Sequence, residues 1–136
     1  MEALNRFDLD LVDKVIEEER PLNAMEVEID ADCGNVIARR QPTASDLRLV
    51  MASSKAITNL ERAGDEARKS AKRTRRIAKD EAGKIINTAE IRLSGQMATA
   101  ILHRALDAFA RLDVITAARI VREDETIDAQ YRAFMR

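Results

Sequence analysis

The stretch Gln41-Pro42-Thr43-Ala44-Ser45-Asp46 separates two long segments in which apolar residues recur at helical spacing. Pro42 disfavours helical backbone geometry at the residue before it, so one helix should end at Gln41 and another can begin beyond it. The first segment runs from about residue 8 to 40, and the second from about residue 44 into the seventies. This break therefore predicts two long helices joined by a short turn.

Two features of these segments bear on how they pack. Pro21 lies inside the first segment, where a proline removes one backbone hydrogen bond, so we expect a kink or a restart near Glu19–Pro21. The stripe of the second segment shrinks to Gly64, Ala67 and Ala71 in its C-terminal half. Small residues along one face predict close approach by a neighbouring helix.

The composition favours helices throughout. The 136 residues include only four glycines and two prolines, and aromatic residues make up 3%. Such a chain has few turns and few strand formers, so we expect an all-α fold, an antiparallel helical bundle. Two more helices are predicted at about 85–111 and 114–136, after a break at about 79–83.

The N-terminal helical segment is repeated at the C-terminus, where Asp8 corresponds to Asp113, the expected cap of the last helix. Other corresponding pairs are Leu9 with Val114, Val15 with Ile120, Ile16 with Val121, Glu19 with Asp124, Leu22 with Ile127 and Asn23 with Asp128. Polar and apolar positions both match, which is more than shared helix periodicity. We expect one repeat at 1–80 and another at 81–136, both incomplete, the second continuing beyond Arg136.

Charge and apolar runs limit the functional classes. The net charge of -1 argues against a general nucleic-acid binder. No apolar run approaches the roughly 20 residues needed to cross a bilayer, and the single cysteine, Cys33, indicates a reducing compartment, so we expect a cytoplasmic protein. The basic stretch Lys69–Lys79 is interpreted as the solvated end of a helix. The alternative is an electrostatic surface for an acidic partner or anionic lipid.

Three pairs of oxygen-bearing side chains are spaced four residues apart, which places each pair on one helix face. They are Glu19 with Asn23, Glu61 with Asp65, and Asp124 with Asp128. Carboxylates beside an apolar stripe need an arginine, a raised pKa or a metal ion. Oxygen ligands from two facing helices suit magnesium, calcium, manganese or iron. The alternative is that they are solvated or form salt bridges with Arg20, Arg62 and Arg68.

Signals of an enzyme are absent from the sequence. There is one histidine, His103, and no Glu-x-x-His pair of the kind found in di-iron helical bundles. The chain has no recognisable catalytic triad and no phosphate-binding glycine loop. Cys33 lies on an apolar stripe and is expected to be a buried small hydrophobe. We therefore predict a protein that acts by binding and not by catalysis.

Several motifs resemble those of the PhoU family, in the order in which the family has them. The segment Val36–Met51 resembles the family signature, and Leu60-Glu-Arg-Ala-Gly-Asp65 resembles its Leu-Glu-Arg-Ile-Gly-Asp motif. Leu106–Asp113 and Val121–Asp128 are also similar. The resemblance implies tandem three-helix bundles, here incomplete at both ends. It also implies that these three pairs supply metal ligands, although Asn23 departs from the acidic form and should weaken that site.

The resemblance further implies a negative regulator of the phosphate-starvation response that couples the phosphate ABC transporter to the sensor histidine kinase. Its expected cofactors are divalent or trivalent ions such as iron, manganese, magnesium or zinc. The expected partners are the kinase and the transporter's ATPase subunit, with homodimer formation, no nucleic acid, and a peripheral position at the inner membrane through partners. The alternative is a structural helical bundle that mediates interactions without a metal site.

Overall fold

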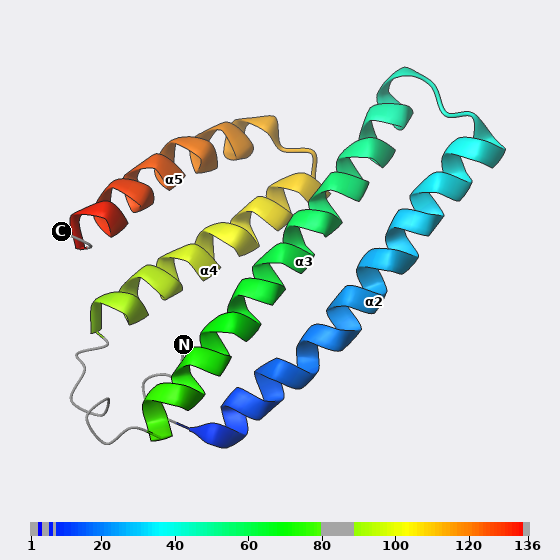
Figure 1. The fold of residues 1–136 in the computed structure, drawn as a ribbon. Helices are drawn as coiled ribbons and strands as arrows, with labels where there is room; N and C mark the ends of the chain where they lie inside the picture. Colours follow the sequence, from blue (N-terminus) through cyan, green and yellow to red (C-terminus); the bar gives the residue numbers. More distant parts are fainter. Residues whose placement is uncertain (1–2, 4–5, 7, 80–88, 135–136) are drawn as a thin grey trace. The chain divides into compact units, whose positions relative to one another are not determined.

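The structure, a computed structural model, describes residues 3, 6, 8–79 and 89–134. In these ranges all regular structure is helical, which confirms the all-α prediction (Figure 1). The long helices are α2 (Leu9–Arg40), α3 (Ala44–Lys79), α4 (Ala89–Ala110) and α5 (Val114–Phe134). They form two hairpins, α2 with α3 and α4 with α5, each a compact unit. The expected repeat boundary at residues 80 and 81 lies outside the described residues, as does the predicted start of the third helix near 85.

Local hydrogen bonds set both ends of α2. The Asp8 carboxylate accepts from the amides of Asp10 at 3.0 Å and Leu11 at 3.1 Å, which satisfies donors that have no partner within the first turn. At the other end, Gln41 adopts a left-handed conformation with φ 48° and its amide donates to the carbonyl of Ile37. The predicted break at Gln41–Pro42 is confirmed.

Pro21 does not divide α2, which runs unbroken from Leu9 to Arg40, so a restart near Glu19–Pro21 is wrong. The proline costs one backbone hydrogen bond, and packing against α3 continues directly beyond it. Leu22 lies over Gly64, where an added Cβ atom would overlap the leucine side chain. The small residue thus allows the close approach that the sequence predicts.

The α2–α3 interface combines a small apolar core with polar contacts along its length. Val12 is fully buried and packs with Ala71 near the open end of the hairpin. Further contacts between the helices are Ser54 Oγ to Asp30 at 2.5 Å, Thr58 Oγ1 to Glu26 at 3.3 Å, and the ion pair of Arg75 with Asp13. Acidic side chains of α2 therefore face donors of α3 through most of the hairpin in its antiparallel register.

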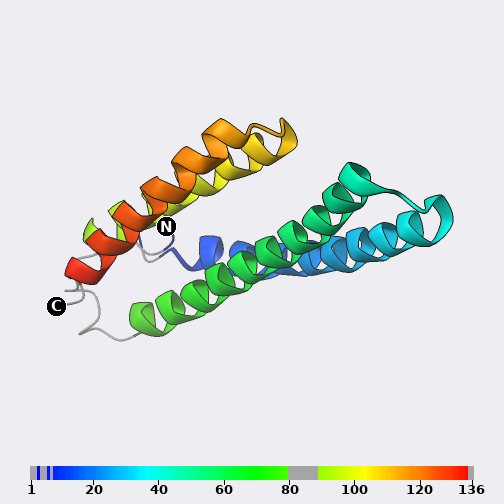
Figure 2. The same ribbon diagram turned by 90° about the horizontal axis from the view of Figure 1, so that it is seen from above.

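A tight turn joins α4 to α5, which lie side by side in both views (Figures 1 and 2). Leu112 has a positive φ of 53°, and the Asp113 amide donates to the carbonyl of Ala108 at 2.8 Å. The Asp113 carboxylate then accepts from the Thr116 amide at 3.0 Å and its hydroxyl at 2.6 Å. These bonds lower the pKa of Asp113 and confirm it as the cap of α5.

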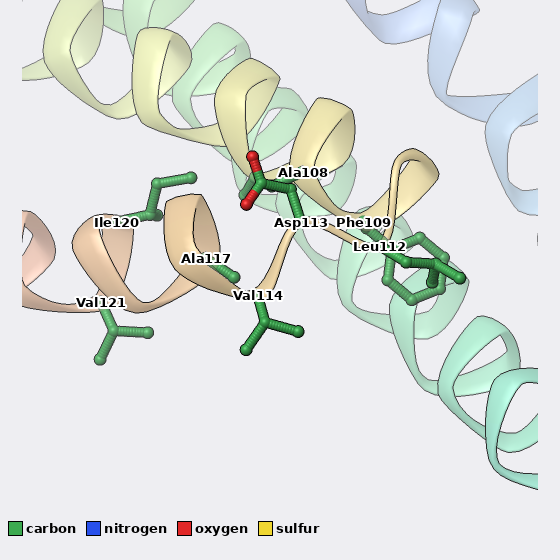
Figure 3. A pocket seen from close by; sticks show the side chains of 9 residues that line it. Ala108, Phe109, Leu112, Asp113, Val114, Ala117, Ile120 and Val121 are labelled. Atoms are coloured by element: carbon green, nitrogen blue, oxygen red, sulfur yellow. The ribbon is translucent and has the colours of Figure 1, made fainter. Parts of the chain in front are cut away.

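The α4–α5 hairpin carries an apolar groove of about 390 Å³ (Figure 3). It is lined by Ala105, Ala108, Phe109, Leu112, Asp113, Val114, Ala117, Ile120 and Val121. Ile120 is buried, whereas Val114 is 77% exposed and Val121 is 64% exposed. None of the described helices has an apolar stretch long enough to cross a bilayer.

Candidate functional site

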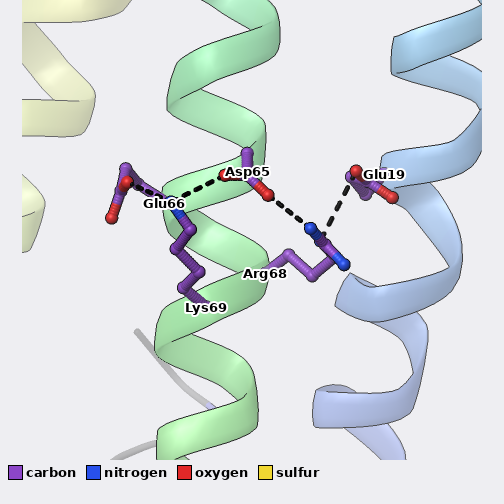
Figure 4. Close-up of polar contacts among 5 residues, drawn as sticks. All are labelled: Glu19, Asp65, Glu66, Arg68 and Lys69. Atoms are coloured by element: carbon purple, nitrogen blue, oxygen red, sulfur yellow. Dashed lines mark hydrogen bonds and ion pairs between the residues drawn. The ribbon is translucent and has the colours of Figure 1, made fainter.

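An arginine lies between carboxylates of two helices at the centre of the candidate site (Figure 4). Arg68 of α3 contacts Asp65 of the same helix, with 2.5 Å from Nη2 to Oδ1. Its Nε lies 3.4 Å from Oε1 of Glu19 on α2. Since Asp65 and Arg68 are three residues apart on a helix, they share the face that is turned to Glu19.

The network continues along α3 to a lysine. Lys69 Nζ lies 2.8 Å from Oδ2 of Asp65 and 2.8 Å from Oε1 of Glu66. One chain of contacts therefore runs from Glu66 through Lys69, Asp65 and Arg68 to Glu19. Asp65 is the only one of these acids that two cations contact within the described residues.

These contacts shift the pKa values of Asp65, Arg68 and Lys69. Hydrogen bonds from Lys69 and then Arg68 lower the pKa of the Asp65 carboxyl from 3.8 to about 2. The bond to Asp65 raises the pKa of Lys69, and the pKa of Arg68 rises through that bond and through the charges of Glu19 and Glu61. Asp65, Arg68 and Lys69 are therefore all charged near neutral pH.

Arg68 is incompletely satisfied. Its side chain is 29% exposed, but its Nε is shielded from solvent and has no hydrogen-bond partner among the described residues. The 3.4 Å approach of Glu19 thus supplies charge attraction without hydrogen-bond geometry. A guanidinium held in this way is less firmly fixed than one that makes two parallel bonds to a carboxylate.

The structure brings together only part of the predicted metal-binding set. Glu19 and Asp65 converge on Arg68, and half-buried Glu61 acts on the same arginine through its charge. Asn23 is exposed on α2. Over the described ranges, no three acidic, histidine or cysteine side chains are placed so that they could hold a metal ion. Of the three arginines in the salt-bridge alternative, Arg68 is the one that these contacts involve.

The second-repeat pair lies on α5, where Asp124 and Asp128 are both exposed. The ion pair that joins this hairpin is a different one, between Arg104 of α4 and Glu123 of α5, with 2.5 Å from Nη1 to Oε2. This pair and the cross-helix contacts of Asp13, Glu26 and Asp30 were not predicted from the sequence. Glu26 and Asp30 are four residues apart on α2, which was an available signal, whereas Asp13 does not share their helical phase. Cys33 is half-buried and His103 is exposed.

Geometry and comparison together define the class of protein. The described chain consists of two helical hairpins, and within each hairpin carboxylate–cation pairs link the two helices. A family model described as the PhoU domain matches residues 1–74. The chain therefore belongs to the PhoU family.

Individual relatives carry the match through the remaining residues. Three relatives are named phosphate-specific transport system accessory protein PhoU or its homolog. Their identity to this chain is 44% for the protein of Burkholderia sp, 43% for that of Escherichia coli K12 and 30% for that of Aquifex aeolicus. These alignments cover 98–100% of this chain but 58%, 55% and 60% of the relatives. The chain thus spans little more than half their length. Their names describe accessory proteins of a transport system, in agreement with the expectation of a non-enzymatic protein.

The acidic shift of Asp65 predicts a specific dependence of stability on pH. Because its pKa is lowered on folding, the carboxylate stabilises the fold above its ordinary pKa of 3.8, and this contribution is lost as the pH falls towards about 2. Asp65→Asn should therefore flatten the loss of unfolding free energy over that interval, measured by urea unfolding at a series of pH values. Asp32→Asn is the control, since Asp32 is exposed and has no ion pair within the described residues. Identical pH profiles for wild type and Asp65→Asn would contradict this assignment.

Proposed function

We propose that this protein is a negative regulator of the phosphate-starvation response, which couples a phosphate ABC transporter to a sensor histidine kinase. The observation that supports it most is the 40–44% identity, over nearly the whole chain, to several proteins named as phosphate-transport accessory proteins. The helical surfaces and the absence of an enzyme motif in the sequence favour action by binding. On this proposal the kinase and the ATPase subunit of the transporter are the partners, and the protein acts in the cytoplasm.

Deletion of the gene in its source cell tests this role. In phosphate-rich medium, deletion should raise expression from a phosphate-starvation promoter several-fold, and the restored gene should reverse the increase. Purified protein should also capture the kinase or the transporter ATPase subunit. Unchanged promoter activity after deletion, together with capture of neither subunit, would overturn the proposal.

We also propose that the α2–α3 carboxylates bind a divalent or trivalent metal ion in exchange for the Arg68 side chain. Glu19 and Asp65 already lie on either side of one positive group, and Glu61 contributes charge to the same place. Three acidic side chains do not converge while the arginine is present, so binding requires the ion pair to open. Carboxylate oxygens suit magnesium, manganese or iron better than zinc, which proteins usually hold with sulfur and nitrogen.

The metal proposal predicts opposite effects of neighbouring substitutions. Arg68→Gln removes the competing charge and should raise the affinity for manganese by about tenfold or more, measured by calorimetry. Glu61→Ala/Asp65→Ala should abolish the binding heat. Asp124→Ala/Asp128→Ala removes the same charge from the other hairpin and should change little, because two side chains supply few of the roughly six oxygens that a hard cation seeks. Equal heats of manganese binding for wild type and Glu61→Ala/Asp65→Ala would contradict the metal proposal.

We further propose that two copies of the chain associate through the apolar groove of α4–α5. The internal repeat supports a second copy of the chain as the partner. Ile16 of α2 packs beside the buried Val12 cluster, whereas its repeat counterpart Val121 of α5 is 64% exposed. An uncovered apolar surface of this kind favours self-association.

A matched pair of charge insertions tests the dimer. Val121→Glu should convert it to a monomer in light scattering, since a charge in an apolar contact is costly. Val27→Glu is the control, because Val27 on α2 is 63% exposed and lies outside the groove. A wild-type monomer at high concentration, or equal effects of the two substitutions, would contradict the proposal.

A further inference from the structure

The C-terminal half of α3 carries a band of positive charge on one face. The band consists of Lys69, Lys72, Arg73, Arg76 and Lys79, all exposed. At about 100° of rotation per residue they span only about 120° of the helix circumference. These five basic residues therefore lie on one side of α3, and we refer to them as the cationic face.

The cationic face is turned away from the α2 interface. Ala71 and Thr74, which are buried, occupy the opposite side of α3. The two arginines whose helical phase brings them closer to that side, Arg68 and Arg75, form ion pairs with Glu19 and Asp13 of α2. The ion pairs across the hairpin, more than helix phase alone, thus distinguish an inward pair of arginines from the outward band, because Lys79 lies only about 20° from Arg68 in helical phase.

Most of the outward band lacks compensating charge. Lys69 contacts Asp65 and Glu66, but Lys72, Arg73, Arg76 and Lys79 have no ion pair within the described residues. Residues 69–81 contain two acidic side chains and six basic ones, of which Arg75 is paired with Asp13, in a chain whose net charge is -1. The positive potential is therefore local, and it can direct one face of the molecule towards a negative surface.

The chemistry of the band indicates which negative surface fits. Over the described residues between Met51 and Ile91, no large apolar side chain is exposed, and residues 52–90 contain no aromatic residue. Protein interfaces depend on buried aromatic or aliphatic anchors, and single-stranded nucleic acid binds by stacking on aromatic rings. A bilayer that contains anionic phospholipids needs only clustered lysine and arginine to attract a protein.

We propose that the cationic face of α3 binds directly to an anionic phospholipid surface. Flexible lysine and arginine side chains contact headgroup phosphates, while the apolar residues of the helix stay engaged with α2, so nothing inserts into the bilayer. Binding is reversible and salt-sensitive, because the interaction is screened over about 10 Å at 0.1 M salt. This interaction does not depend on the proposed regulatory role, and it needs no partner protein to reach the membrane.

Vesicle co-sedimentation tests the proposal with two variants of equal charge. The purified protein should bind vesicles of phosphatidylcholine with phosphatidylglycerol, but not phosphatidylcholine alone. The variant Lys72→Gln/Arg73→Gln/Arg76→Gln/Lys79→Gln should lower partitioning at least about tenfold. The control variant Arg40→Gln/Arg48→Gln/Lys55→Gln/Arg62→Gln removes the same charge from exposed positions outside the band and should change it less than about twofold.

Several outcomes would overturn the proposal. These are no binding of wild type to anionic vesicles, equal losses in the two variants, or binding to duplex DNA or an acidic protein but not to vesicles. Circular dichroism checks that both variants are folded. If the variant of the cationic face is not folded, a salt titration of wild-type binding to the anionic vesicles tests the proposal instead. Binding that persists unchanged at high salt would contradict an electrostatic surface.

Discussion

The approach of α2 to α3 brings charged side chains of both helices into one interface, and the fold depends on how they are neutralised. Leu22 over Gly64 sets the short separation, and one turn away Arg68 lies between Glu19 and Asp65. A charge withdrawn from water is costly unless it is paired, and removal of one partner leaves the other exposed to that cost. The register that places a cation between these acids is thus selected together with the apolar contacts.

Local features of the fold could be predicted from the sequence because their causes are local. Pro42 restricts the residue before it, and the Asp113 carboxylate reaches amides in its own turn. Pro21 shows where such reasoning fails. A proline removes one hydrogen bond, but packing before and after it holds α2 together, and this long-range contribution is not visible in the local sequence.

For the candidate site, the sequence predicts which side chains share a helix face, but not which residues lie opposite them. Four-residue spacing places two side chains on one face but does not say what lies opposite. Arg20, Arg62 and Arg68 were equally compatible with the acidic residues, and the antiparallel register of α2 and α3 selects Arg68. The same register leaves Asn23 exposed. An arginine and a metal ion offer alternative ways to neutralise converging carboxylates, so the acidic pattern cannot distinguish them without the position of that one side chain.

Position on the helix also explains why the basic residues of α3 have two roles, although they form one run in the sequence. Some form ion pairs with α2, and the others are exposed to solvent. Arg68 and Arg75 are seven residues apart, about two helical turns, so both reach α2 and are consumed in ion pairs. Lys72 and Arg76 lie on another face of the same turns and have no acid opposite them within the described residues. Charge that fixes the hairpin and charge that is free to meet an outside surface are therefore interleaved in sequence but separated in space. A substitution of a basic residue in α3 therefore tests either the ion pairs with α2 or the exposed cationic face, and the position of the residue on the helix decides which.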